Sequence, residues 1–268
     1  MKIPQECLKR HDEIYKGQQL NRAMAKKSPE KWKTWGNVFD NFTIVTIHKI
    51  IDKGIINGLV GPLKIGKESN VFVAKIDGRS IIVKIYRLET CDFKKMYDYI
   101  KYDPRYSSLH KRRRLIIFSW VQRELRNLHI ARVAGLRVPT PIHASNNVLI
   151  EEFIGDDSKN QDGAAPQLKD QIPEDPEKFY RQVKVMIKKL LKAKLVHADL
   201  SQFNILNNDE KPVFIDFSQS TPIDNPRAKE YFLNDAKNIT NFFTKIGVEC
   251  QMREYEEMWD ECVTSQSF

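Results

Sequence analysis

The feature that most constrains the fold of this chain is the stretch from residue 195 to residue 220. Within it, two short apolar segments flank a cluster of turn-forming residues at 207–212, which predicts a β-hairpin. Three polar residues lie at the edges of this hairpin: Asp199, Asn204 and Asp216. One carboxylate can orient or deprotonate an attacking group, while an amide oxygen and a second carboxylate can hold Mg²⁺ with phosphates. The alternative is a polar hairpin in which these residues only cap turns.

The order and spacing of these three residues are those of the protein kinases. Asp199 and Asn204 are five positions apart, as in the kinase catalytic loop. Asp216 closes the following strand, where kinases carry a metal-binding Asp. The spacing therefore favours Asp199 as the catalytic residue, with Asn204 and Asp216 as metal ligands.

Upstream of the hairpin, three apolar runs predict strands, and a Lys lies deep in the third. The runs cover residues 59–65, 71–76 and 81–86, and Asp77-Gly78 between the last two is typical of a hairpin turn. Kinases place their phosphate-positioning lysine in the corresponding strand, which favours this role for Lys84. The alternative is a surface lysine on an edge strand. Glu124, in a predicted helix over 115–134, is then the expected ion-pair partner of Lys84, although a Glu on a helix is more often plain surface.

The turn between the first two predicted strands departs from the kinase pattern. It contains Gly66, Lys67 and Ser69 but no repeated glycines. Such a turn has to hold phosphate through its backbone N–H groups, the Ser69 hydroxyl and the Lys67 side chain. Taken alone, it is weak evidence for a nucleotide site.

This order of elements predicts an α+β, two-lobed, protein-kinase-like fold. Residues 1–40 are a basic N-terminal arm, residues 41–153 form an N-lobe with an antiparallel sheet and helices, and residues 154–268 form a mostly helical C-lobe that carries the catalytic hairpin. Within the C-lobe, residues 156–175 are expected to be a polar crossing with little regular structure, followed by an amphipathic helix and two terminal helices.

A basic, hydrophilic segment, residues 101–114, interrupts the N-lobe. It contains six Lys or Arg residues against a single Asp. We expect a flexible loop that is too polar to pack. A solvated loop, a nuclear-localisation signal and a contact with an RNA backbone are all compatible with this composition.

The composition is that of a soluble globular protein, except for a formal net charge of +9. Such a charge suggests a polyanionic partner such as RNA, although a diffuse positive surface that serves solubility is the alternative. The four Cys residues are widely separated, which favours reduced thiols in a cytosolic or nuclear protein over a zinc site. No apolar run is long enough to span a membrane, and the N-terminus lacks a signal-peptide core.

Several motifs closely resemble those of the RIO family of atypical protein kinases. They are the segments 66–71, 166–170, 197–204, 215–220 and 226–243. The resemblance implies the reduced form of the kinase fold that this family has. The similarity spans residues 41–263 and is nearest to the first RIO subfamily, because residues 1–40 offer no winged helix of the second. The third subfamily shares much of the catalytic stretch.

The resemblance implies an ATP- and Mg²⁺-dependent serine/threonine kinase that works as an ATPase in late maturation of the small ribosomal subunit. Its partners are then ATP and the pre-40S particle with its RNA, with no membrane, and its compartment is the cytoplasm and also the nucleus. By position, Lys84 contacts the α- and β-phosphates, and the backbones of Glu152 and Ile154 meet the adenine edge. The family's counterpart of Asp216 also accepts phosphate as an aspartyl-phosphate.

The small number of residues after Asp216 favours an ATPase over a kinase that acts on protein substrates. Only 52 residues follow, too few for the activation segment and peptide platform of an ordinary protein kinase, so water or an enzyme carboxylate is a plausible phosphoryl acceptor. Two other functions remain open. One is a ribosome-assembly factor that uses ATP as a conformational ligand with negligible turnover. The other is a small-molecule phosphotransferase, whose long C-terminal helical region does not fit this length.

Overall fold

The computed structural model of the protein describes residues 39–106, 109 and 112–263. The chain divides into two compact units, residues 1–45 and 46–268. In the first unit, helix α3 (Asn41–Asp52) begins after Asp40, whose carboxylate accepts hydrogen bonds from the N–H and the hydroxyl of Thr43 at 3.0 and 2.8 Å. Such a cap satisfies N–H groups that a helix leaves unpaired at its start. Except for residues 39 and 40, the predicted basic arm lies outside the described residues.

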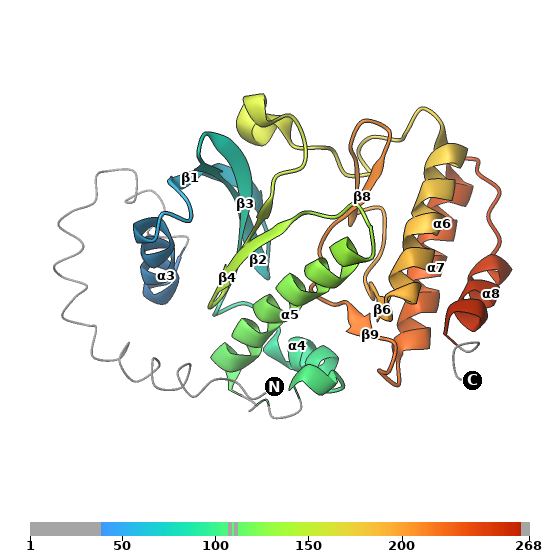
Figure 1. Ribbon diagram of the computed structural model, residues 1–268, viewed down its shortest axis with the longest axis horizontal. Coiled ribbons are helices and arrows are strands. Elements are labelled where there is room, and N and C mark those ends of the chain that lie inside the picture. The colour runs from blue at the N-terminus through green and yellow to red at the C-terminus, as the bar shows by residue number, and fades with distance from the viewer. Residues whose placement is uncertain (1–38, 107–108, 110–111, 264–268) are drawn as a thin grey trace. The chain divides into compact units, whose positions relative to one another are not determined.

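The second unit starts within α3 and contains a five-stranded antiparallel sheet in the order β1-β2-β3-β5-β4 (Figure 1). Its strands are β1 (Gly58–Ile65), β2 (Ser69–Ile76), β3 (Arg79–Tyr86), β4 (Pro141–Ser145) and β5 (Val148–Glu152). Asp77 and Gly78 have φ angles of 47° and 79°, so β2 and β3 are joined by a two-residue turn whose twist suits the hairpin. The three strands predicted before residue 87 are confirmed. Strand β4 was not predicted, because Pro141 at its start and Pro139 just before it do not suit a strand pattern.

Two helices accompany the sheet. Helix α5 (Arg113–Val133) packs against β4 and β5, and the short helix α4 (Phe93–Ile100) packs against α5. Asp92 caps α4 by accepting a hydrogen bond from the N–H of Lys95. Only Met96 and Ile100 of α4 are buried, so its apolar pattern is too sparse to reveal it in the sequence.

The expectation of a flexible, unpacked loop at residues 101–114 is wrong for much of the part that the structure describes. Residues Pro104–Tyr106 form a 3₁₀ turn, η3, and α5 begins at Arg113. Asp103 is 1% exposed, because Arg105 and the buried Arg123 of α5 supply ion-pair partners. The guanidinium of Arg113 also donates to the carbonyl of Glu89. Long-range ion pairing therefore buries charge that the local sequence presents as solvated.

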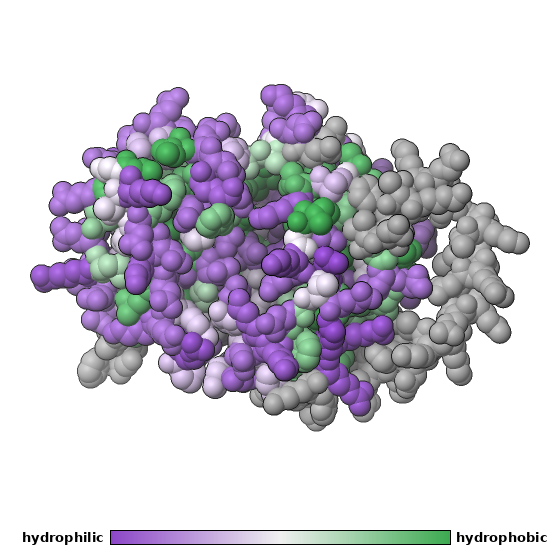
Figure 2. All heavy atoms as spheres, turned by 180° about the vertical axis from the view of Figure 1, so that it is seen from behind, coloured by the Kyte–Doolittle hydropathy of each residue, from purple (hydrophilic) through white to green (hydrophobic). Residues whose placement is uncertain are grey.

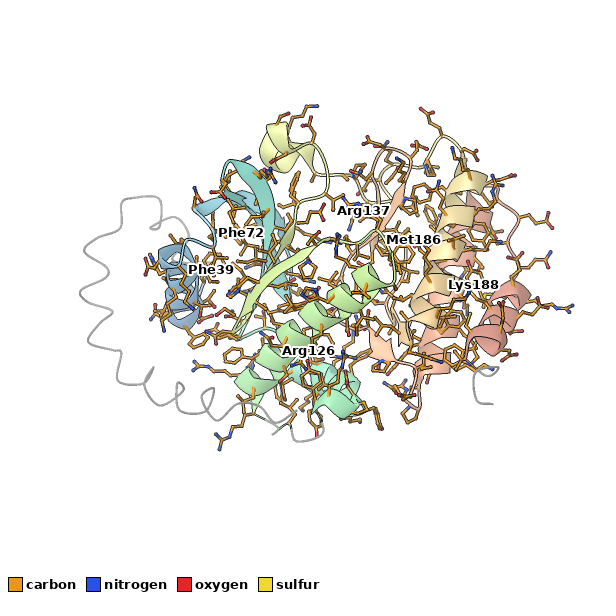
Figure 3. The ribbon with its side chains drawn as sticks, viewed as in Figure 1. Phe39, Phe72, Arg126, Arg137, Met186 and Lys188 are labelled. Atoms are coloured by element: carbon orange, nitrogen blue, oxygen red, sulfur yellow. The ribbon has the colours of Figure 1, made fainter. Side chains whose placement is uncertain are left out.

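Three helices form the core of the C-terminal part: α6 (Pro176–Lys192), α7 (Ala228–Lys245) and α8 (Arg253–Cys262) (Figure 1). The ring of Phe243 on α7 lies 4.9 Å from that of Tyr180 and 6.4 Å from that of Phe179, both on α6. Met186 belongs to the same buried face of α6, whereas Lys188 reaches out to Glu261 on α8 (Figure 3). The amphipathic helix and the two terminal helices predicted here are confirmed.

Two small antiparallel pairs of strands lie between α6 and α7 in the chain. The predicted catalytic hairpin is present as β7 (Ile205–Asn207) and β8 (Pro212–Phe214). Strands β6 (Leu195–Val196) and β9 (Thr221–Pro222) form the second pair, which is too short for a sequence pattern to reveal. The predicted polar crossing includes a 3₁₀ segment, η4 (Asp157–Gly163), which begins soon after β5 ends.

The surface seen in Figure 2 is mostly hydrophilic, with hydrophobic residues scattered among polar ones. The described part of the chain contains no helix that is both long and apolar enough to cross a bilayer. Its three cysteines, Cys91, Cys250 and Cys262, are free thiols.

Candidate active site

The catalytic segment, residues 197–204, is held in place by helix α7. The backbone N–H groups of Ala198 and Leu200 donate to the two carboxylate oxygens of Asp235, at 2.8 and 2.7 Å. Burial raises the pKa of Asp235 well above its ordinary value, although both N–H donors favour the ionised carboxylate. Ala198 has a φ of 65°, a strained region for a residue other than glycine, and the neighbouring hydrogen bonds stabilise it there. Asp199 lies between the two anchored N–H groups.

Asp199 and Asn204 lie in contact, as their spacing predicts. The amide nitrogen of Asn204 donates to the backbone carbonyl of Asp199 at 2.8 Å and to its carboxylate at 3.2 Å. Gln219 also donates to this carboxylate, at 2.9 Å. Burial and the nearby charge of Asp216 raise the pKa of Asp199 to about 6. A carboxylate with such a pKa is ionised at neutral pH yet basic enough to accept a proton from an attacking hydroxyl or water.

Lys84 is the centre of the site. Its ammonium lies 2.8 Å from Glu124 on α5, which confirms the predicted ion pair, and 2.9 Å from Asp216, which was not predicted as its partner. Lys84 is 6% exposed and Glu124 is fully buried, and the hydroxyl of Tyr86 donates to the second oxygen of Glu124 at 2.5 Å. Burial alone would lower the pKa of Lys84, but Asp216 and Glu124 raise it well above its ordinary value. The lysine is therefore charged, and it joins the sheet to α5 and to the catalytic hairpin.

Asp216 follows β8 in a left-handed conformation, with a φ of 62°. Burial would raise the pKa of its carboxyl group, but Lys84 lowers it to about 2. The preceding residue is fixed on both sides, because the N–H of Ile215 donates to Asn204 and its carbonyl lies 3.1 Å from Nε2 of His197. Burial lowers the pKa of His197 to about 4, so its ring is neutral at physiological pH.

The residues predicted to hold Mg²⁺ fit a magnesium ion by their chemistry. The hydrogen bonds and the ion pair of Asp216 use Oδ1, which leaves Oδ2 as a ligand, and the amide nitrogen of Asn204 is bound to Asp199, which leaves its amide oxygen. Across the described ranges, no group of three or more His, Cys, Asp or Glu side chains could hold a metal ion. Two protein oxygens are enough for Mg²⁺, which usually keeps waters and substrate phosphate oxygens as its other ligands.

The turn before β2 is shaped by backbone contacts. The N–H of Gly66 donates to the carbonyl of Ser69 at 3.0 Å, and a Cβ atom on Gly66 would come within 2.8 Å of that oxygen. Thr90 donates to the carbonyl of Lys67 at 2.6 Å, which ties the turn to the segment after β3. The Lys67 side chain is exposed and Ser69 is half-buried. Their predicted contact with phosphate stays a prediction.

The segment that follows β5 includes a backbone N–H group without a hydrogen-bond partner. The N–H of Ile154 makes no hydrogen bond within the described residues, although Ile154 is 5% exposed. A buried N–H group without a partner is rare and suits the predicted contact with an adenine edge. Glu152 is more constrained, because its N–H donates to the carbonyl of Thr140 and its carboxylate binds the side chains of Thr140 and Arg137.

Glu151, which the sequence reasoning missed, lies on the same face of the sheet as Lys84. It is paired with Ile82, two positions before Lys84 on β3, and residues two apart on a strand share a face. Glu151 is 9% exposed and its carboxyl group makes no hydrogen bond or ion pair among the described residues. Burial and the charge of Glu124 raise its pKa to about 8. Strand alternation from Lys84 and Leu149 was the signal that could have placed it inside.

The sheet, helix α5 and the catalytic hairpin therefore assemble a lysine, its glutamate partner and a charged carboxylate beside an aspartate suited to proton transfer. In the protein kinases the same parts bind a nucleoside triphosphate and transfer its terminal phosphoryl group. The protein is thus of the protein-kinase-like class.

Comparison with known proteins narrows this class to a family. A family profile described as the RIO domain matches residues 70–257. The RIO-type serine/threonine-protein kinase Rio1 of Haloferax volcanii is 36% identical over 227 residues, which cover 84% of this chain and 77% of that protein. The Rio1 kinase of Methanocaldococcus jannaschii is 39% identical over 230 residues, which cover 85% of this chain and 78% of that protein. The chain belongs to the RIO family of atypical serine/threonine protein kinases, and the names of these relatives agree with the predicted first subfamily.

A solved structure confirms the predicted fold. The Rio2 kinase of Chaetomium thermophilum, in a complex described as ADP/Mg²⁺-phosphoaspartate, superposes with a TM-score of 0.61 at 22% sequence identity, covering 84% of this chain and 70% of that one.

Proposed function

We propose that the protein binds ATP with Mg²⁺ at this site and transfers the γ-phosphoryl group. The observation that carries the proposal is the position of Lys84, buried between Glu124 and Asp216 at 2.8 and 2.9 Å. An ammonium group held by two carboxylates is fixed in direction, so it can meet phosphate oxygens without further ordering. Asn204 and Asp216 would hold the metal ion, which supplies charge neutralisation to the phosphates when bound.

Asp199 has the geometry and the pKa of the residue that handles the proton. Its backbone is anchored on both sides, and its carboxylate is oriented by Asn204 and Gln219. In this role it accepts a proton from the attacking group or orients that group toward the phosphorus. It is not expected to hold the nucleotide.

We further propose Asp216 or water as a phosphoryl acceptor. Direct attack by water, or hydrolysis of the aspartyl-phosphate by water with release of phosphate and of the free carboxylate, would make the enzyme an ATPase. Two findings support this: the carboxyl group of Asp216 is ionised at any physiological pH, and the Rio2 relative was solved as a phosphoaspartate complex. An aspartyl-phosphate is an acyl phosphate, so it should be cleaved by hydroxylamine, whereas phosphoserine should not. Labelling the protein with γ-³²P-ATP and treating it with hydroxylamine tests this acceptor directly.

Calorimetry tests the nucleotide site. Lys84→Ala should weaken ATP binding both with and without Mg²⁺, because the lysine contacts phosphate itself. Asp216→Ala should bind ATP equally well with and without Mg²⁺, because a metal ligand is lost. If both variants bind ATP like the wild type at every Mg²⁺ concentration, the site is assigned to the wrong residues.

The proposed partner is the pre-40S ribosomal particle, in the cytoplasm and also in the nucleus. Membership of the RIO family and the net charge of +9 support a partner that contains RNA. The contact with RNA predicted for the basic segment stays a prediction. It is now confined to residues other than Arg105, which is bound to Asp103, and Arg113, which is bound to Glu89. Sedimentation of the tagged protein from cells, with and without non-hydrolysable ATP, should show it in the small-subunit fractions. A protein found only at the top of the gradient in both cases would exclude a stable association.

A further inference from the structure

Two buried side chains of α5 bind the whole segment that follows Asp216. Arg123 donates from Nη1 to the carbonyl of Ser218 at 3.1 Å and from Nη2 to the carbonyl of Gln219 at 3.4 Å. Asn127 donates from its amide nitrogen to the carbonyls of Phe217 and Ser220, at 3.1 and 2.9 Å. The carbonyls of residues 217–220 are therefore all held by two side chains that are four residues, or about one helical turn, apart. We call Arg123 and Asn127 the α5 clamp.

The clamp is fully inside the protein. Arg123 and Asn127 are each 0% exposed, and Phe217 and Ser220 are also 0% exposed. Residues 217–220 belong to no helix or strand, and among the described residues only the carbonyl of Phe217 accepts a backbone N–H, from Ser220 at 3.2 Å. A buried carbonyl without a hydrogen bond is unfavourable, and the clamp supplies the bonds that secondary structure does not. The conformation of this segment thus depends on α5.

The charge of the clamp is balanced by a residue from the segment before α5. Asp103 accepts from Nε of Arg123 at 3.2 Å and from the Arg105 guanidinium at 2.6 Å. Arg105 in turn donates to the amide oxygen of Asn127 at 3.0 Å. Burial lowers the pKa of Arg123 to about 10, so the guanidinium stays charged at neutral pH. Asp103 and Arg105 therefore orient both members of the clamp.

The same helix also holds the lysine partner of Asp216. Glu124 follows Arg123 directly and forms the ion pair with Lys84, which lies 2.9 Å from Asp216. Asp216 itself is in the left-handed region, with a φ of 62°, which residues other than glycine adopt infrequently. Its neighbours are fixed on one side through Ile215 and on the other by the clamp. Because the strained residue lies between two anchored segments, its carboxylate stays directed at Lys84.

We propose that Arg123 and Asn127 are positioning residues that fix the backbone after Asp216 and so hold its carboxylate in place for the metal ion. The inference rests on the proposed role of Asp216 as a Mg²⁺ ligand and extends it to residues that touch neither metal nor nucleotide. The clamp acts through the backbone, so its loss should affect Mg²⁺-dependent binding more than the binding of nucleotide alone.

Calorimetry over a series of Mg²⁺ concentrations tests the proposal. Asn127→Ala removes both amide bonds, and Arg123→Lys keeps the charge beside Asp103 but cannot reach two carbonyls. In both variants we expect ATP affinity without Mg²⁺ to stay within about twofold of the wild type. The Mg²⁺ concentration that gives half of the maximal increase in ATP affinity should rise roughly tenfold, because a tenfold change corresponds to the loss of one or two net hydrogen bonds. Arg126→Lys is the matched control, because Arg126 lies on the same helix but reaches Tyr106 rather than the clamped carbonyls (Figure 3).

Thermal melting of each variant separates positioning from general stability. An Asn127→Ala protein that melts at lower temperature but keeps the wild-type Mg²⁺ midpoint would overturn the proposal. If Arg123→Lys does not fold, Asn127→Ala alone decides the matter. Asp216→Ala separates the proposed role of Asp216 from the proposed role of the clamp. If this change removes the increase in ATP affinity that Mg²⁺ causes, while the clamp variants keep that increase, only the proposal about the clamp is wrong. If the wild type shows no Mg²⁺ enhancement, the proposed function and the clamp both fail.

Discussion

Replacing Lys84 by Met should cost far more stability than its single positive charge suggests. The ammonium lies within 3 Å of two carboxylates, one of which, Glu124, is fully buried. Met fills much of the same volume, so the change leaves packing nearly intact and removes mainly the charge. Breaking a buried ion pair on one side typically costs about 3–5 kcal/mol, because the remaining charge is uncompensated. We therefore expect a loss of about 3–5 kcal/mol in the free energy of unfolding at pH 7.5.

The pH dependence of this loss gives a second check. Lys84 holds the pKa of Asp216 at about 2, and burial raises the pKa of Glu124 even beside Lys84. Without the lysine both folded-state pKa values rise above the unfolded values, so folding takes up protons as the pH falls. The variant should therefore recover part of its stability between pH 7.5 and about pH 5, where carboxyl groups begin to protonate.

Urea denaturation of Lys84→Met and of Lys75→Met, each compared with the wild type, provides the assay. Lys75 is the matched control, because its ion pair with Asp157 is 3.4 Å long and both side chains are partly exposed, by 27% and 44%. Such a pair contributes about 1 kcal/mol or less. Equal losses in the two variants, unchanged by pH, would refute the assignment of Lys84 to a buried charge cluster.

Three further predictions concern other buried groups. The pKa of Glu151 is raised to about 8, so wild-type stability should fall as pH rises from about 4.3 to 8; Glu151→Gln should lose that slope and be the more stable protein at pH 8 in urea denaturation. The pKa of His197 is lowered to about 4, so the contribution of its neutral ring should be lost as pH falls below about 6.5; His197→Gln should show a flatter profile between pH 4 and 6.5, and a parallel curve would contradict this reasoning. In Asp235→Asn, the amide has one oxygen that can accept a hydrogen bond, whereas the two carboxylate oxygens of Asp235 accept from the N–H groups of Ala198 and Leu200. The variant should bind ATP with near wild-type affinity by calorimetry but turn it over about tenfold more slowly, from the loss of one hydrogen bond.

The parts of the site that could be predicted from the sequence are those set by local spacing. Asp199, Asn204 and Asp216 lie in one hairpin and in the segments directly before and after it. Residues this close along the chain are also close in space, so their spacing predicts that they lie near one another. Lys84 and Glu124 are 40 residues apart, and only the resemblance to kinases linked them. The strands that carry Lys84 were readable because apolar residues dominate them and an Asp-Gly turn separates them.

The parts that could not be predicted depend on burial of charge. In the sequence, Arg123 on its helix and Asp103 in the basic segment look like surface residues. They nevertheless form an ion pair across 20 positions, and Arg123 also donates to the carbonyl of Ser218, 95 positions further along. Nothing in the local pattern separates a buried Arg from a solvated one, because the partner that makes burial tolerable is remote in sequence. Glu151 was missed for a related reason, since adjacent Glu residues at a strand end usually indicate solvent. Its neighbour Glu152 does reach Arg137 and Thr140 near the surface, and only the pairing of β5 with β3 turns Glu151 toward Lys84.

The central claim, that this site transfers a phosphoryl group rather than only binding ATP, is tested most directly by turnover of the Asp199→Asn variant. Release of phosphate from γ-³²P-ATP is measured for the wild type and the variant at ATP and Mg²⁺ concentrations that saturate both, with occupancy checked by calorimetry. Asp199 orients the attacking group but does not hold the nucleotide, so ATP affinity should stay within severalfold of the wild type. Turnover should fall by roughly the 10²–10⁴-fold typical of a lost acid-base residue. Turnover that survives nearly intact at equal occupancy would contradict the catalytic role of Asp199 and favour a protein that uses ATP as a conformational switch.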